Sequence, residues 1–275
     1  MKIGIDFGGT NIRIGVVDKG IIVKKIAESC KADKSEKEIL DHLISMIHQV
    51  INSDITSIGI GVPSVVDVKR GIVYNVNNIP SWKEVHLKEI LEKEFKIPVS
   101  VNNDCNCFAL GEHSCGEGAN FDDIVCVALG TGVGSGIIFN NKLCNGANTG
   151  AGEIGELSYL QHNYEYYCSS HFFIKEHNIT GREAYDRACQ KDAEALKIWD
   201  EFGIHVGNLL KTILFAYDPQ AIILGGSISK SFEFFSPKMY ETLYTFPYPE
   251  TVAKLKIACS KKDDIAIVGA ADLII

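Results

Sequence analysis

An Asn-Asn-Asp triplet at residues 102–104 has the residue types that a hydroxyl-activating site needs. Asp104 could take the proton of a substrate hydroxyl, because a positioned carboxylate acts as a general base worth about 10²–10⁴-fold in rate. Asn103 could hold a neighbouring hydroxyl of the same substrate. Asp104 is equally well placed to cap a helix starting at Cys105, since Asp is favoured at helix N-caps. The triplet alone leaves both roles open.

A first glycine turn, Asp6-Phe7-Gly8-Gly9-Thr10-Asn11, follows the expected strand Lys2–Phe7. Paired glycines let the backbone approach a ligand closely and adopt positive φ, and the Thr and Asn that follow add donors. Asp6, at the strand end, could hold Mg²⁺ through water, because Mg²⁺ keeps several of its waters. The alternative is a plain glycine hairpin.

A second glycine turn covers residues 130–136, beginning Gly130-Thr131-Gly132. Its spacing is like that of dinucleotide-binding folds, but the segment that follows is strand-like where those folds need a helix. Two glycine turns in equivalent places could instead hold the phosphates of one nucleotide. A third glycine segment, Gly225-Gly226-Ser227, follows a buried strand and offers either bare backbone for an adenosine or an ordinary strand-to-helix turn.

Two carboxylates stand three residues apart at Glu153 and Glu156, in a glycine-rich segment. They could bind a metal or the hydroxyls of a sugar. A solvated acidic turn is the alternative, because Glu is mostly exposed in globular proteins.

The elements that must position these residues occur twice. An antiparallel meander over residues 2–26 precedes a helix with a capping box, Ser35 to Glu38, then a strand Ser57–Val62, a helix Leu87–Phe95 and a strand Pro98–Asn102. This is the order of a ribonuclease-H-like domain. Strand, glycine turn, strand and polar turn recur from residue 123, which indicates an internal duplication. Helical composition over 181–216 and a closing helix over 263–275 follow.

The composition restricts the class of protein. The chain has 275 residues, 46% of them hydrophobic, and a net charge of −8, which argues against broad nucleic-acid binding. It has neither a membrane-length apolar run nor the features of a signal peptide, so we expect a cytoplasmic protein. Its nine cysteines include no CxxC pair and predict reduced thiols rather than a zinc ribbon.

Together these motifs resemble the ROK family (repressor, open reading frame, kinase) of bacterial sugar kinases. The resemblance to the family's nucleotide side covers the first phosphate motif, at Asp6–Thr10, the second phosphate motif, at Leu129–Gly136, and the adenosine segment, at Leu224-Gly225-Gly226. On the sugar side it covers two loops, at Gly61-Val62-Pro63 and Asn78-Ile79-Pro80-Ser81-Trp82, and the catalytic Asn103-Asp104 pair. The closing helix matches at Asp263-Asp264 and Gly269-Ala270-Ala271.

The resemblance implies an α/β protein of two ribonuclease-H-like, actin-like ATPase domains with a cleft between them, divided here as residues 1–112 plus 263–275 and residues 113–262. It implies ATP- and Mg²⁺-dependent phosphorylation of a hexose hydroxyl, usually O6, by a homodimer. Asp104 would be the base. The sugar would meet Asn78, Asn103, Asp104, Glu153, Glu156 and Glu176, and the nucleotide Asp6, Gly8, Gly9, Thr10, Asn11, Gly130, Thr131, Gly132, Gly225 and Gly226.

Two departures from the family pattern bear on the substrate. Glu156 replaces the usual histidine of the E-x-G-H motif, and residues 164–176 carry one cysteine and one histidine where the family has a zinc loop. Four N/S ligands are needed for structural zinc, so we expect none. The zinc-less branch includes N-acetylmannosamine kinases, which makes an N-acetylhexosamine a candidate beside glucose. The alternative is a sugar-sensing regulator, although the helix-turn-helix of the family's repressors does not precede Met1.

Overall fold

The computed structural model describes residues 1–76, 78–147 and 150–273, and these form two compact units. The first unit comprises residues 1–120, 136–151 and 261–275, and the second comprises residues 121–135 and 152–260. The domain division expected from the sequence, with boundaries at residues 112 and 263, stays a prediction. In the described part of the chain, no helix is both long and apolar enough to span a bilayer.

The first unit is built on a five-stranded sheet in the order β3-β2-β1-β4-β8. The meander is antiparallel, and β4 and β8 extend it in parallel. Ile3, Ile5 and Phe7 of β1 are fully buried. The strands are β1 (Lys2–Phe7), β2 (Asn11–Asp18), β3 (Ile21–Ser29), β4 (Ile58–Val62) and β8 (Val99–Asn103).

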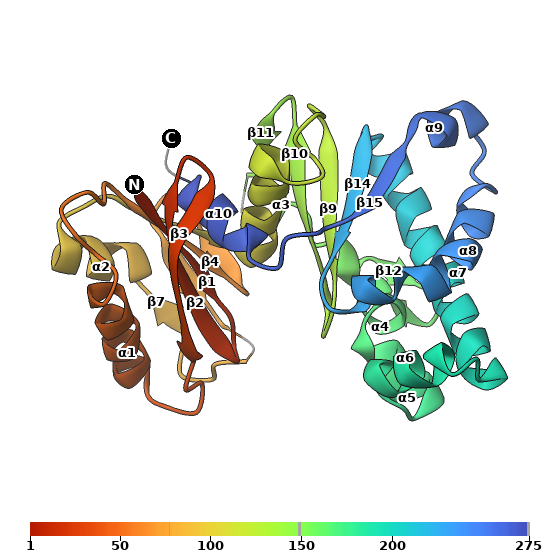
Figure 1. Ribbon diagram of the computed structural model, residues 1–275, viewed down its shortest axis with the longest axis horizontal. Helices are drawn as coiled ribbons and strands as arrows, with labels where there is room; N and C mark the ends of the chain where they lie inside the picture. Colours follow the sequence, from red (N-terminus) through yellow and green to blue (C-terminus); the bar gives the residue numbers. More distant parts are fainter. Residues whose placement is uncertain (77, 148–149, 274–275) are drawn as a thin grey trace. The chain divides into compact units, whose positions relative to one another are not determined.

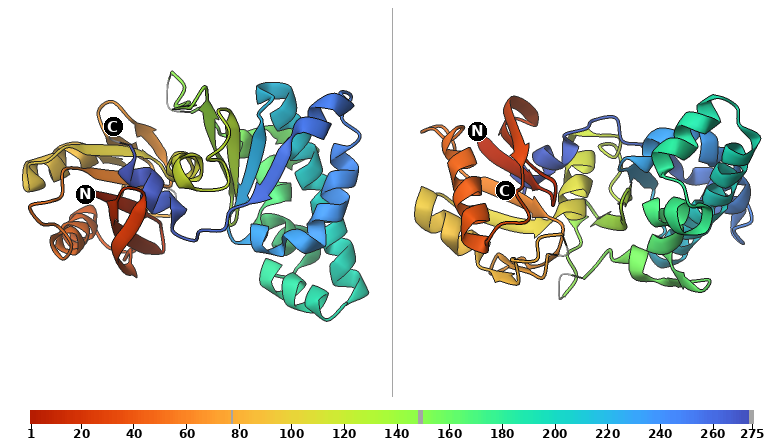
Figure 2. Two further views of the ribbon diagram at one scale, coloured as in Figure 1. Left: turned by 45° about the horizontal axis from the view of Figure 1, so that its top comes forward. Right: turned by 90° about the horizontal axis from the view of Figure 1, so that it is seen from below.

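Helices cover both faces of this sheet (Figure 1). The helices α1 (Glu36–His48) and α2 (Leu87–Phe95) lie on one face, and α3 (Asp104–Cys115) and α10 (Ile265–Ala271) lie on the other. The capping box predicted for α1 is confirmed. The last helix is shorter than the expected 263–275, and residues 274–275 of that expectation lie outside the described residues. Figure 2 shows α10 beside the first strands, although the two are about 260 positions apart in the sequence.

Glycines set the distance between α3 and α10. A Cβ atom built at Gly269 would lie 1.8 Å from the carbonyl oxygen of Cys107, and one at Gly111 would lie 2.1 Å from that of Ile265. Only residues without a side chain let the two backbones approach this closely. The helix that begins with Asp104 is therefore held by the last helix of the chain.

A small three-stranded sheet of β5 (Val65–Asp67), β6 (Ile72–Tyr74) and β7 (Glu84–Val85) lies between β4 and α2 in the sequence. The sequence analysis did not predict these strands, because each has only two or three residues and too short a pattern to read. Trp82, next to this sheet, is fully buried and stacks on Phe7 with ring centroids 4.6 Å apart.

The second sheet has the order β11-β10-β9-β14-β15, with β9, β14 and β15 parallel. It repeats the plan of the first sheet, which confirms the expected duplication. Its strands are β9 (Ile124–Leu129), β10 (Val133–Phe139), β11 (Lys142–Leu143), β14 (Ala221–Gly225) and β15 (Lys256–Cys259). The second unit takes the first three residues of β10, and the first unit takes the rest together with β11.

The second unit is otherwise mainly helical, and the composition predicted this only for residues 181–216. Its long helix α7 (Ala193–Tyr217) carries twelve buried residues and packs against α8 (Phe232–Leu243). The shorter elements are a 3₁₀ helix η1 (Ile154–Glu156), β12 (Ser158–Tyr159), β13 (His162–Asn163), α4 (Tyr164–Cys168), α5 (Ser170–His177), α6 (Gly181–Cys189), a 3₁₀ helix η2 (Ile228–Ser231) and α9 (Pro249–Lys254).

Candidate active site

The junction between β8 and α3 positions Asp104. Asn103, not Asp104, is the N-cap of α3: its Oδ1 accepts hydrogen bonds from the N–H groups of Cys105, at 2.8 Å, and Asn106, at 3.3 Å. The interpretation of Asp104 as the cap is wrong, because the strand ends one residue later than expected and the helix already includes Asp104. Asp104 Oδ1 accepts from the N–H of Cys105 at 2.8 Å.

The electrostatic environment of Asp104 raises its pKa from the ordinary 3.8 to about 7. Removal of the carboxyl group from water is the main cause, and the negative charge of Asp6 adds to it. Hydrogen bonds from the N–H of Cys105 oppose the rise without reversing it. A carboxyl group with this pKa changes its protonation near neutral pH, which is where a general base is most effective.

Asp6 belongs to a chain of charges that starts at the first glycine turn. Burial raises its pKa, while its ion pair with Arg13, the residue opposite on β2, lowers it. Arg13 also approaches Asp264 at 3.5 Å, and Asp264 pairs with Lys25 at 2.6 Å. The end of β1 is thereby connected to the residue that precedes α10.

The first glycine turn lies directly against Asn78. A Cβ atom built at Gly9 would come within 2.6 Å of the Cβ of Asn78, so a larger residue at position 9 would displace that side chain. The turn is closed by a hydrogen bond from the N–H of Gly8 to the carbonyl of Asn11 at 2.9 Å. A candidate sugar residue and a candidate phosphate turn are therefore neighbours in the first unit.

In the second unit, two of the candidate nucleotide segments lie side by side. Leu129 and Gly225 end the neighbouring parallel strands β9 and β14. Gly226 has a φ of +81°, and a Cβ atom there would lie 2.2 Å from the carbonyl oxygen of Leu129. Glycine is required at position 226 for both reasons.

Glu165, which the sequence analysis did not single out, lies against the second glycine turn. Its Oε2 accepts from the N–H of Val133 at 3.0 Å, and a Cβ atom at Gly132 would lie 2.4 Å from the same oxygen. Partial burial and the charges of Glu156 and Glu165 raise the pKa of Glu153. Three carboxylates therefore gather beside the second glycine turn.

The position of Glu165 results from the packing of α4, and its only signal in the sequence was its place within the stretch expected to replace the zinc loop. Glu176, which we predict to contact the sugar, accepts a hydrogen bond from the hydroxyl of Tyr166 at 2.7 Å on the protein surface. Its predicted contact with a sugar is not tested by this bond.

The stretch from Tyr164 to Glu176 forms α4 and α5. Phe172 and Phe173 are fully buried, and Tyr167 packs against His205 with centroids 4.9 Å apart. Among the described residues, His, Cys, Asp and Glu side chains form no group of three or more that could hold a metal ion. The expectation that the protein binds no zinc stays a prediction.

Comparison with known proteins identifies the class. The ROK family model matches residues 2–275, and the chain belongs to the ROK family. It is 28% identical to a glucokinase from Halalkalibacterium halodurans over 99% of this chain and 94% of the relative. It is 31% identical to a xylose repressor from Bacillus spizizenii over 84% of this chain and 65% of that protein.

Solved structures agree with this assignment. A ROK family glucokinase from Streptomyces griseus in complex with glucose and AMPPNP superposes with a TM-score of 0.84 and is 28% identical, over 99% of this chain and 98% of that one. The predicted fold class is confirmed: the protein is a mixed α/β protein with two actin-like ATPase domains of the kind found in ROK sugar kinases. Its relatives include both sugar kinases and repressors.

Proposed function

We propose that this protein transfers the γ-phosphoryl group of ATP to the O6 hydroxyl of a hexose or N-acetylhexosamine. Glucose and N-acetylmannosamine are the first candidates. The observation that carries this proposal is the carboxyl group of Asp104, whose pKa of about 7 suits proton removal from an alcohol. Related sugar kinases, including the glucokinases, support the reaction class.

Asp104 acts as the base in this proposal. It takes the proton of the sugar hydroxyl as the oxygen bonds to the γ-phosphorus and the bond from phosphorus to the bridging oxygen of ADP breaks. Positioning and charge stabilisation dominate phosphoryl transfer, so the orientation of Asp104 at the first turn of α3 matters as much as its pKa. Asn103 can offer the sugar only its Nδ2, because its Oδ1 caps the helix, and one N–H of that Nδ2 already donates to the carbonyl oxygen of Ser64.

In our proposal Asp6, whose carboxylate also pairs with Arg13, would hold Mg²⁺ through water. Mg²⁺ prefers carboxylate and water oxygens, and the charge of Asp6 disfavours ionisation of Asp104. A cation at Asp6, held through water, would offset that repulsion. When bound, Mg²⁺ neutralises charge on the phosphates of ATP.

In our proposal the nucleotide is bound by the residues of the glycine segments: Asp6, Gly8, Gly9, Thr10, Asn11, Gly130, Thr131, Gly132, Gly225 and Gly226. Asn78, Asn103, Glu153, Glu156 and Glu176 contact the sugar. We add Glu165 to this set because it lies among the other two carboxylates of the second unit.

The test is direct detection of ADP with glucose, mannose, allose, N-acetylglucosamine and N-acetylmannosamine as acceptors. We expect Asp104→Asn to lower kcat by about 10²–10⁴-fold, as loss of a general base does, while the dissociation constant of the sugar changes little. Asp41→Asn, an exposed change on α1, is the matched control. Full activity in Asp104→Asn would remove Asp104 from the mechanism, and inactivity of the wild type on every sugar would refute the kinase.

A second candidate is a sugar-responsive regulator, which the similarity to a xylose repressor favours. Such a protein would bind sugar without sugar-dependent release of ADP, so the same assay separates the two. We also propose that the protein acts in the cytoplasm, as a homodimer, and binds no nucleic acid. Light scattering of the purified protein tests the dimer.

A further inference from the structure

The first unit contains a hollow of about 520 Å³ that none of the roles above uses. It lies between the β5–β6 hairpin and the segment that follows β11. Its lining combines apolar, aromatic, charged and amide side chains: Val65, Asp67, Val68, Lys69, Tyr74 and Asn145, with Gly146 and Ala147. Mixed lining of this kind is typical of small-molecule sites.

Hydrogen bonds connect the hollow to the residues around Asp104. Asn145, on its wall, accepts from the Nδ2 of Asn102 at 2.9 Å, and Asn102 accepts from the N–H of Asn103 at 2.8 Å. Asn102 is buried, so this amide chain is fixed. The hollow is therefore two hydrogen bonds away from the residue that precedes the proposed base.

A second connection runs through Ser64. The Nδ2 of Asn103 donates to the carbonyl oxygen of Ser64 at 3.4 Å, and the hydroxyl of Ser64 donates to the carbonyl oxygen of Tyr74. Val65, which follows Ser64, and Tyr74 both line the hollow and are paired across β5 and β6. A sugar held at Asn103 would have this hollow as its neighbour within the same unit.

The volume selects among possible occupants. At the ≈30 Å³ that a water occupies in the liquid, the hollow has room for roughly 17 waters. An N-acetyl group has about four non-hydrogen atoms and would leave nearly all of this space to solvent, whereas a second hexosyl ring with about eleven would fill roughly a third of it and leave room for waters that bridge the ring to the walls. Size therefore favours a whole additional ring over an acyl substituent.

We propose that this hollow is a subsite for a second sugar ring, so that the acceptor is a glycoside whose added ring is joined at the end away from the transferred hydroxyl. This inference rests on the proposed sugar site at Asn103. Val65 and Tyr74 give apolar surface for the face of a ring. Lys69 and the amide nitrogen of Asn145 serve as donors, and Asp67 serves as an acceptor, to its hydroxyls.

The test uses calorimetric binding, which does not depend on catalysis. Glucose is compared with cellobiose and maltose, and N-acetylglucosamine with its β-1,4-linked disaccharide. We expect at least one disaccharide to bind about tenfold more tightly than its monosaccharide, as one or two additional hydrogen bonds would give. Val65→Trp, which fills the hollow from an exposed strand position, should remove this preference.

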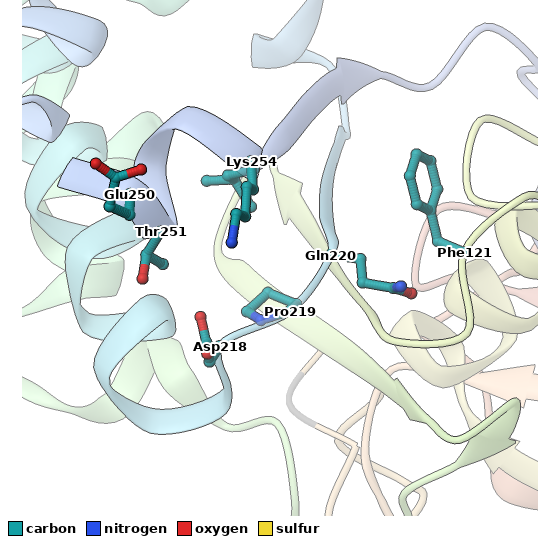
Figure 3. Close-up of a pocket in the computed structure, with 8 residues that line it drawn as sticks. Phe121, Asp218, Pro219, Gln220, Glu250, Thr251 and Lys254 are labelled. Atoms are coloured by element: carbon teal, nitrogen blue, oxygen red, sulfur yellow. The ribbon is translucent and has the colours of Figure 1, made fainter. Parts of the chain in front are cut away.

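Thr251→Trp is the matched control. Thr251 lines a hollow of similar volume, about 450 Å³, in the second unit (Figure 3). The Thr251→Trp variant adds the same indole to a hollow of the other unit, and we expect this variant to keep the preference for the disaccharide. If Val65→Trp unfolds, Lys69→Ala, which removes only an exposed donor, should weaken disaccharide binding several-fold more than monosaccharide binding.

The outcomes separate the two proposals. Tighter binding of a disaccharide that Val65→Trp or Lys69→Ala abolishes supports the subsite, even if no sugar is phosphorylated and the kinase fails. Equal affinities for every pair, or a preference that survives both variants, overturn the subsite, even if a monosaccharide is phosphorylated and the kinase stands.

Discussion

Asp104→Asn should make the protein more stable at alkaline pH while leaving its stability at acid pH almost unchanged. In the folded protein the carboxyl group of Asp104 keeps its proton up to a pKa of about 7, whereas in the unfolded chain it ionises near the ordinary 3.8. The folded state binds more protons between these values, so stability falls as pH rises through them. The asparagine carries no such penalty.

The size of the effect comes from the same two values. Each pH unit between them costs about 1.36 kcal/mol, so from about pH 5 to about pH 8 Asp104 should destabilise the wild type by about 3 kcal/mol. Most of this comes from burial and the remainder from the charge of Asp6. The advantage of Asp104→Asn over the wild type should grow by that amount over the same interval.

Urea unfolding at several pH values measures this difference. The chain has two tryptophans, Trp82 in the first unit and Trp199 in the second, so Trp199→Phe leaves Trp82 fluorescence as a reporter of the unit that contains Asp104. Asp41→Asn on α1 shows what loss of an exposed carboxylate does in the same unit. A stability difference between Asp104→Asn and the wild type that stays constant with pH would show that Asp104 ionises normally.

Three further predictions follow from the same contacts. The kcat/KM of the wild type should fall about tenfold for each pH unit below a midpoint near 7, because protonated Asp104 is no base; a flat profile, measured by ³¹P NMR, would contradict this. Gly226→Ala should weaken ATP binding and destabilise the second unit by more than about 1 kcal/mol. Gly20→Ala, also at positive φ but in open space, should cost only about 1 kcal/mol. Equal losses of stability in urea unfolding would refute the contact with Leu129. Ser35→Ala should cost α1 about 1 kcal/mol, and an unchanged urea midpoint would mean that the capping box contributes nothing.

The sequence predicted the elements whose patterns are long and regular. The meander, the capped helix α1, helix α2 and the buried strands of both sheets lie within one or two residues of their expected positions, except for β3, which runs three residues further. Their apolar residues recur with the period of a strand or helix, and glycine turns mark their ends. Elements with two or three residues, such as β5 to β7, have no readable period and were missed.

The candidate site was predictable where one short motif places the residue and unpredictable where packing does. Asp104 follows directly from the end of a strand, so its position came from the sequence. Glu165 reaches the second glycine turn because α4 packs beside it, and nothing in its neighbouring letters indicates this contact. The pKa of Asp104 likewise depends on Asp6, almost a hundred residues earlier, whose proximity results from the parallel pairing of β1, β4 and β8.

The position of Asp104 therefore depends on parts of the chain to which we assign no contact with the sugar. Its helix is held at its far side by Gly111 against α10, and α10 in turn follows Asp264, which pairs with Arg13 and Lys25. Arg13 also pairs with Asp6, the carboxylate that raises the pKa of Asp104. The same ion pairs therefore connect Asp6, whose charge helps to raise the pKa of Asp104, to the start of α10, which holds the helix that carries Asp104. A phosphoryl transfer site needs both adjustments at once, because a base with the right pKa in the wrong orientation contributes little.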